Sequence, residues 1–122
     1  MSIKVGDIGR PIYVPTSFDL SSNTELEIKF TSPDGQTKFS KTKTSDGVTA
    51  PAVPSPALPA DTETGFPGGV FAANTYMLYT TIAGDFDTGG DGLWPVCANY
   101  TDATPKFYQG DDGLLSIDPA CD

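Results

Sequence analysis

The chain contains no histidine. That absence excludes Ser-His-Asp and Cys-His nucleophilic sites as well as histidine-ligated metal centres. Cysteine is also scarce, since only Cys97 and Cys121 occur in 122 residues. Two cysteines are too few for a disulfide framework or a four-cysteine zinc site. Cys97 lies in an apolar run and is expected to pack as a small hydrophobe. A Cys97–Cys121 bridge is the alternative, which a reducing compartment disfavours.

Long apolar runs are absent as well. No stretch is long enough to cross a bilayer, and Met1 to Lys4 lacks the apolar core of a secretion signal. The length fits one domain over residues 1–122 with a core of its own. We therefore expect a single domain that folds in a cytoplasm and has no membrane partner.

Basic residues are few. Seven Lys and Arg stand against sixteen Asp and Glu, which gives a net charge of −9. Neither Lys nor Arg occurs between Lys43 and Lys106. Such a surface repels phosphate backbones, so nucleic acid is not an expected partner. The acidity is explained either by solubility or by a partner with a basic surface.

Helical periodicity is missing, and strand periodicity takes its place. Leu26, Ile28 and Phe30 alternate with polar residues, which is typical of a strand with one buried face. Pro33-Asp34-Gly35 then provides the residues of a tight turn. A second alternating run, Gln36 to Thr44, completes a predicted antiparallel hairpin.

Short strands separated by turn residues recur through the rest of the chain. They are expected at Pro11–Val14, Asn74–Ile82 and Leu93–Thr101. The last part of the chain is expected to form either a pair of strands, Lys106–Tyr108 and Leu114–Ile117, or one strand broken at Gly110–Gly113. A tail follows at 118–122. About seven strands in this arrangement favour an all-β fold, an immunoglobulin-like antiparallel β-sandwich.

The strand at Leu93–Thr101 is the most apolar. Trp94, Val96, Ala98 and Tyr100 share one face of it, and the single tryptophan is expected to anchor the core. We expect this face to lie against Leu26, Ile28 and Phe30 from the opposite sheet of the sandwich.

Residues 46–72 interrupt the strand pattern. Five prolines prevent regular pairing there, which indicates polyproline II or an ordered surface excursion. Long loops in compact domains are often functional. The apolar and proline residues of this insert are the candidates for a protein interface: Val53, Pro54, Pro56, Leu58, Pro59, Phe66 and Phe71.

Acidic residues in glycine-rich loops raise the question of calcium or catalysis. A calcium site of Asp85, Asp87 and Asp91 is disfavoured, because the fifth and twelfth positions of an EF-hand loop would be Gly89 and Val96. A glycine-rich turn with aspartate caps is favoured instead. The adjacent pairs Asp85/Asp87 and Asp111/Asp112 do not predict carboxylates facing each other across a cleft. No enzyme activity, metal or cofactor is expected.

Several short pieces resemble a known family in order along the chain. They are Val5–Gly9 with Ile12–Val14, then Asp19–Thr24 with Leu26–Phe30 and Pro33–Gly35, then Tyr79–Thr81 with Ala83–Asp87, and last Gly92 and Trp94 with Lys106–Tyr108. Together they resemble the small immunoglobulin-like domains of tailed-bacteriophage virion proteins, such as the N-terminal domain of baseplate upper proteins. Residues 46–72 are an insertion relative to that pattern, while Leu93 is an extra residue and Pro95 interrupts a strand.

The resemblance implies a non-catalytic structural protein of the virion, assembled in the cytoplasm of the host bacterium. Its partners would be other phage virion proteins of the capsid or tail, with self-association on the particle as a further option. The implied role is that of a capsid decoration protein or a small tail or adaptor component. The alternative is a carbohydrate- or host-surface-binding module, for which the candidate aromatics are Tyr13, Phe66, Phe71, Tyr76, Tyr79 and Tyr108.

Overall fold

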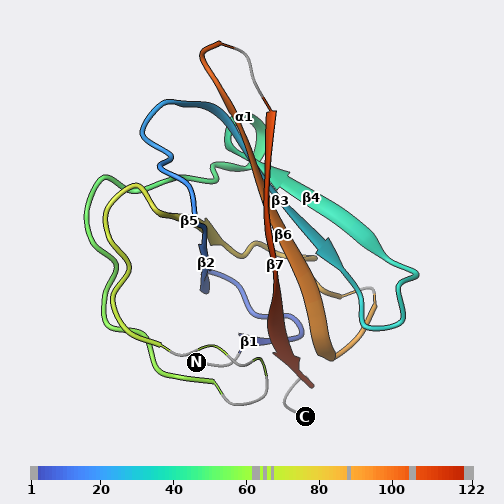
Figure 1. Cartoon of the computed structure of the whole chain (residues 1–122). Helices are drawn as coiled ribbons and strands as arrows, with labels where there is room; N and C mark the ends of the chain where they lie inside the picture. The colour runs from blue at the N-terminus through green and yellow to red at the C-terminus, as the bar shows by residue number, and fades with distance from the viewer. Residues whose placement is uncertain are drawn as a thin grey trace.

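The computed structural model describes residues 3–61, 64, 66, 68–87, 89–104 and 107–119. Figure 1 shows a molecule built mainly of strands, which confirms the predicted all-β class. In chain order the elements are β1 (Ile3–Lys4), β2 (Pro11–Pro15), β3 (Asn23–Thr31), β4 (Lys38–Thr42), α1 (Lys43–Asp46), β5 (Tyr76–Thr80), β6 (Gly92–Asp102) and β7 (Phe107–Asp118). None of the helical segments in these residues is long and apolar enough to cross a membrane.

The strands form two sheets. Five of them lie in the order β1-β7-β6-β3-β4, with β1 parallel to β7 and every other pair antiparallel. The remaining two, β2 and β5, make a small antiparallel sheet. In Figure 1 this small sheet lies beside the long strands β3, β6 and β7.

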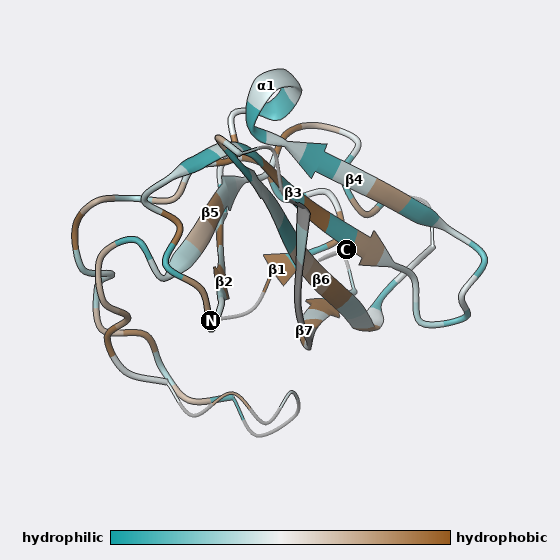
Figure 2. Ribbon diagram, turned by 45° about the horizontal axis from the view of Figure 1, so that its top comes forward, coloured by the Kyte–Doolittle hydropathy of each residue, from teal (hydrophilic) through white to brown (hydrophobic). Residues whose placement is uncertain are grey.

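The predicted hairpin is present as β3 and β4, with Phe30 opposite Phe39. The N–H of Gly35 donates to the C=O of Ser32 at 2.9 Å, and Gly35 adopts φ 76°, a backbone conformation that glycine tolerates best. In Figure 2 apolar and hydrophilic positions alternate along β3, whereas β4 is mainly hydrophilic with one apolar stretch. The turn residues and the alternation therefore specified the same local structure.

The second strand of the hairpin ends earlier than expected. The run Gln36 to Thr44 was expected to be extended throughout, but β4 stops at Thr42 and the one-turn helix α1 follows. The Thr42 hydroxyl caps this turn by accepting from the N–H of Ser45 at 3.1 Å. A single turn is too short to produce a helical period in the sequence.

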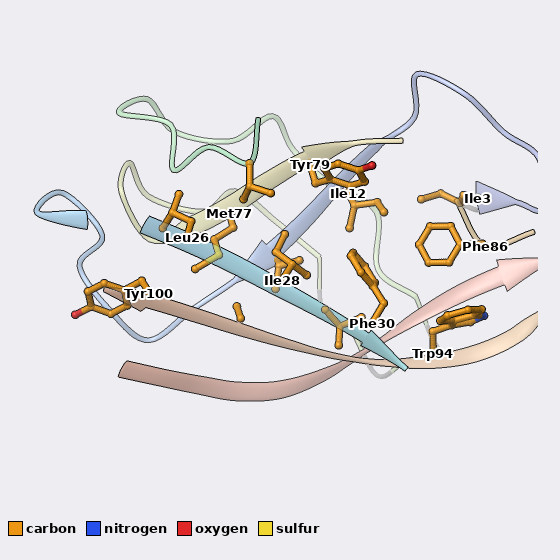
Figure 3. Close-up of a cluster of buried hydrophobic side chains, with 14 of the residues drawn as sticks. Ile3, Ile12, Leu26, Ile28, Phe30, Met77, Tyr79, Phe86, Trp94 and Tyr100 are labelled. Carbon is orange, nitrogen blue, oxygen red and sulfur yellow. The ribbon is translucent and has the colours of Figure 1, made fainter. Parts of the chain in front are cut away.

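The expected placement of the core strands is wrong in one respect. Strands β3 and β6 are neighbours in one sheet, with Leu26 opposite Tyr100 and Phe30 opposite Val96, so they do not face each other across a sandwich. The layer that faces them carries Met77 from β5, as Figure 3 shows. Alternation tells which face of a strand is buried, but it does not tell which strands are neighbours.

The two faces of β6 were predicted more successfully. The predicted inward residues are all buried, and Trp94 is fully buried, with its indole N–H donating to the C=O of Gly90 at 3.1 Å. Asn99 departs from the pattern, because it lies on the outward face yet is only 1% exposed. Its amide donates to Glu27 Oε1 at 3.1 Å, so a polar contact between β6 and β3 accounts for the burial.

The last part of the sheet is a single strand. Phe107–Asp118 pairs with β6 over most of its length, so the expected alternative of a final strand pair is wrong. A register shift between Cys97 and Asn99 marks the irregularity on the β6 side. The glycine and aspartate residues of β7 thus interrupt the pairing without ending the strand.

Candidate functional site: an apolar groove beside the arm

The proline-rich insert folds back on itself. The N–H of Ser55 donates to the C=O of Phe71 at 2.9 Å, and Leu58 and Gly69 exchange two backbone bonds of 3.0 and 2.9 Å. Nearer the tip, the N–H of Asp61 donates to the C=O of Phe66 at 2.9 Å. We refer to the described residues between 52 and 72 as the arm. Figure 2 shows it extending away from the two sheets.

Gly68 permits the close approach of the two sides of the arm. A Cβ atom at this position would lie 2.7 Å from both the nitrogen of Ala60 and the carbonyl oxygen of Leu58. The residue also has φ +75°, which strains any other side chain. The arm can therefore close in this form only with glycine at position 68.

Aromatic contacts fix the arm against the small sheet. The ring of Phe71 lies 5.6 Å from Phe66 within the arm and 6.3 Å from Tyr76 of β5. The hydroxyl of Tyr76 donates to the C=O of Val53 at 3.0 Å, and its ring lies 6.0 Å from Tyr13 of β2. The arm is therefore a docked element rather than a free tether.

A groove of about 470 Å³ lies between the arm, β2 and β7. Most of its lining is apolar, and the lining residues are Ile3, Pro11 to Ser17, Leu58, Pro59, Asp61, Thr64, Phe66, Val96 and Gly113 to Ser116. Asp61 is the one charged side chain among those lining residues. A groove of this size and composition is suited to binding apolar groups.

On the β2 side, the groove is bordered by a strand edge that prolines have blunted. The N–H of Thr16 donates to the C=O of Thr75, and the N–H of Thr81 donates to the C=O of Arg10. In an antiparallel pair such groups alternate along the strand. The backbone groups of Pro11, Tyr13 and Pro15 therefore point away from β5, and of these three residues only Tyr13 has an N–H to offer.

The β7 side is different. The C=O of Asp118 accepts the N–H of Val5 at 3.0 Å, so the backbone groups of Asp118, and by alternation those of Ser116 and Leu114, point away from β6. Strand β1 pairs with β7 only at Ile117 and Asp118. No strand in the described part of the chain pairs with Leu114 on that side.

The predicted interface residues divide into two groups. Leu58, Pro59 and Phe66 line the groove together. Val53, Pro54 and Pro56 are exposed on the arm without lining it, and Phe71 is half-buried between Phe66 and Tyr76.

Sequence reasoning missed most of the other two walls. On the β2 side they include Pro15 and Tyr13, of which only Tyr13 was a candidate, as an aromatic for sugar binding, and on the β7 side they include Leu114 and Leu115. One signal was available in the sequence: Pro11 and Pro15 flank Tyr13 at alternate positions, as expected for an edge strand that must not pair. Nothing in the sequence indicated that β7 lies opposite.

The aspartates considered for calcium do not form a cluster. Asp85 is buried, with Oδ1 3.0 Å from Lys41 Nζ and Oδ2 accepting from the Tyr79 hydroxyl at 2.5 Å, while Asp87 and Asp91 are exposed. In the parts of the chain that the structure describes, no three His, Cys, Asp or Glu residues gather where a metal ion could bind.

Burial, followed by the hydrogen bond to Asp85, raises the pKa of Tyr79 well above its ordinary value.

Other predicted features lie outside the described residues. They include Cys121 with its alternative bridge to Cys97, and the side chains of the Asp111/Asp112 pair. The Cys97 thiol itself donates to Asn99 Oδ1 at 3.4 Å.

The groove is the candidate binding site among the described residues. Its walls come from three distant parts of the sequence, and its lining is apolar with one acidic side chain. No family model, no curated protein and no solved structure matches the chain.

Proposed function

We propose that the chain is a non-catalytic structural protein of a tailed-phage virion. It docks on other virion proteins as a capsid decoration protein or as a small tail or adaptor component. The observation that carries the proposal is the docked arm with the apolar groove beside it. The resemblance of the strand and turn motifs to phage immunoglobulin-like domains supplies the class of partner.

The arrangement of the sheets supports an immunoglobulin-like β-sandwich as the finer description of the fold. One core is shared by residues of the five-stranded sheet, such as Leu26 and Trp94, and of the two-stranded sheet, such as Ile12 and Met77. Two layers around one core are the defining feature of a sandwich. The curled large sheet and the very short second sheet are the departures from that pattern.

The arm is suited to docking because its shape is held before a partner arrives. Its backbone bonds and the ring contacts of Phe71 fix the wall of the groove. Two of its valines remain available for contact, since Val53 is 61% and Val70 is 59% exposed. A surface that is already ordered loses less entropy on binding, and apolar area provides the driving force.

Particle assembly provides the test. Leu58→Lys places a charge in the groove wall, and Val53→Lys places the same charge on the arm outside the groove. We expect particles to incorporate the Val53→Lys chain and to lose at least about tenfold of the Leu58→Lys chain, because burying an unpaired charge opposes docking. Equal incorporation of the two variants would argue against a docking role for the groove.

A carbohydrate-binding role is the second candidate, because Tyr13 and Phe66 both line the groove. Exposed aromatic rings are the surface on which sugars stack. Against it, Tyr76 and Tyr79 are buried in the core, so they cannot serve as stacking platforms. A glycan array separates the two functions, since specific glycan binding that Tyr13→Ala abolishes would favour the second.

A further inference from the structure

We infer that the groove binds an extended, basic segment of a partner protein, which pairs through its backbone with β7 at Leu114. The inference rests on the proposed function, because it assigns the way in which a partner protein is held. The proposed site is one at which a strand of the partner pairs with β7 and not with β2.

Strand β7 directs backbone hydrogen-bonding groups toward the groove side at Leu114. The N–H and C=O of Leu114 point away from β6, on the same side as those of Ser116 and Asp118. Strand β1 occupies that side only opposite Ile117 and Asp118. A segment alongside Leu114 would meet backbone groups with which no strand among the described residues pairs, and such groups are the basis of strand addition to a sheet edge.

The opposite wall explains why a partner would pair with β7 only. Pro11 and Pro15 of β2 face the outer side of their sheet and have no N–H. Tyr13 alone provides a donor there. A bound segment therefore forms a ladder with β7 and has mainly side-chain contacts with β2 and the arm.

The lining determines the side chains of the partner. Leu115 on the β7 wall and Leu58 and Phe66 on the arm are apolar, so alternate residues of the segment should be apolar. Charge complementarity decides the rest. The chain carries a net charge of −9, and the groove lining has an aspartate but neither lysine nor arginine. A basic segment is attracted to such a site, whereas an acidic one is repelled.

Defined peptides test the inference with the intact chain. The basic peptide is a short extended sequence in which valine and threonine alternate with lysine. The acidic peptide has glutamate in place of lysine. A third peptide repeats the basic one with alternate backbone amides methylated, so that it cannot donate to a strand edge. We expect the basic peptide to bind in fluorescence anisotropy and each of the others to bind at least about tenfold more weakly.

Variants at Leu114 separate backbone pairing from simple adhesion. Leu114→Pro removes the outward N–H at a strand edge, where proline is tolerated, and should reduce affinity for the basic peptide at least about fivefold. Leu114→Ser keeps the N–H and removes the exposed side chain, so it should retain most of the affinity. Amide exchange gives a second measurement on the unaltered chain: the Leu114 amide should be protected when the basic peptide is bound.

Several results would overturn the inference. They are an absence of saturable binding, equal binding of the methylated peptide, or a Leu114 amide that stays unprotected in the complex. Self-association of the chain that Leu114→Pro abolishes would identify a second copy as the occupant instead. These outcomes are distinct from failure of the proposed function, because a chain absent from virions could still bind the peptide, and a chain present in virions could dock by another surface.

Discussion

Lys41 Nζ lies 3.0 Å from Asp85 Oδ1, and both side chains are largely shielded from water. The pair joins β4 of the hairpin to the glycine-rich turn that precedes β6. Lys41 also lies over the rings of Phe39 and Tyr79, at 5.7 and 5.5 Å from their centroids. A turn considered as a calcium loop thus has a structural role in this fold.

Removing the buried carboxylate should destabilise the protein strongly. Asp85→Ala leaves the Lys41 ammonium with Asp46 Oδ1, 4.0 Å away, as its remaining partner, and breaking a buried ion pair in this way costs up to about 3–5 kcal/mol of unfolding free energy. Urea unfolding measures the change. Asp87→Ala is the matched control, because Asp87 is exposed in the same turn and its loss should change the unfolding free energy by less than about 0.5 kcal/mol. Similar values for the two variants would contradict the assignment.

Tyr79 should make the stability of the protein depend on alkaline pH. Because burial and Asp85 raise its pKa in the folded state, its contribution to stability is complete below the unfolded value near 10 and is lost as the pH rises above that value. Wild type should therefore exceed Tyr79→Phe in unfolding free energy at neutral pH, by about 1 kcal/mol.

The difference between wild type and Tyr79→Phe should shrink above pH 10, by up to about 1.4 kcal/mol per pH unit. Urea unfolding of both proteins across that range measures it. The comparison cancels the contributions of the other tyrosines, including Tyr108, whose pKa the hydrogen bond to Asp102 also raises. A constant difference in unfolding free energy across the range would show that folding does not raise the pKa of Tyr79.

The arm should open when Gly68 gains a side chain. Gly68→Ala combines a strained φ with a Cβ clash against the backbone of Ala60, so the paired sides of the arm must separate. Limited proteolysis should then cleave the arm faster, with little change in the near-ultraviolet signal of Trp94. Gly35→Ala is the control, since its φ of +76° matches the +75° of Gly68 while its Cβ would meet nothing within 4 Å. Faster cleavage of the arm in both variants would contradict the clash.

Restoring donors to the edge of β2 should strengthen peptide binding. Pro11→Val combined with Pro15→Val adds two N–H groups that face the groove side of β2. The basic peptide could then pair with both walls, and its affinity should rise by about tenfold. Anisotropy titration measures the gain, and Pro33→Val in the β3–β4 turn is the control with an added N–H elsewhere. An unchanged affinity would mean that β2 does not border the bound segment.

The fold was predictable where structure is local. The β3–β4 hairpin follows from alternation at Leu26 to Phe30 and from the turn residues Pro33 to Gly35, because neighbours in sequence form both. The pairing of β3 with β6 was not predictable in the same way. Two strands with apolar faces can lie side by side in one sheet under a common layer or face each other across two sheets, and alternation does not distinguish these arrangements.

The groove shows the same limit. Leu58, Pro59 and Phe66 were identifiable because apolar residues in a proline-rich insert call for an explanation. Their counterparts on β2 and β7 lie far away in sequence, and each looks like an ordinary strand residue when considered alone. Only the folded chain brings the blunted edge of β2 and the Leu114 edge of β7 to one groove.

The central claim is that this chain is a virion component held by protein contacts, and the most direct test counts it in particles. Quantitative mass spectrometry of virions purified from cultures that produce the chain should find it in a fixed number of copies per particle. Absence of the chain from purified particles, or a copy number that varies between preparations, would contradict the account.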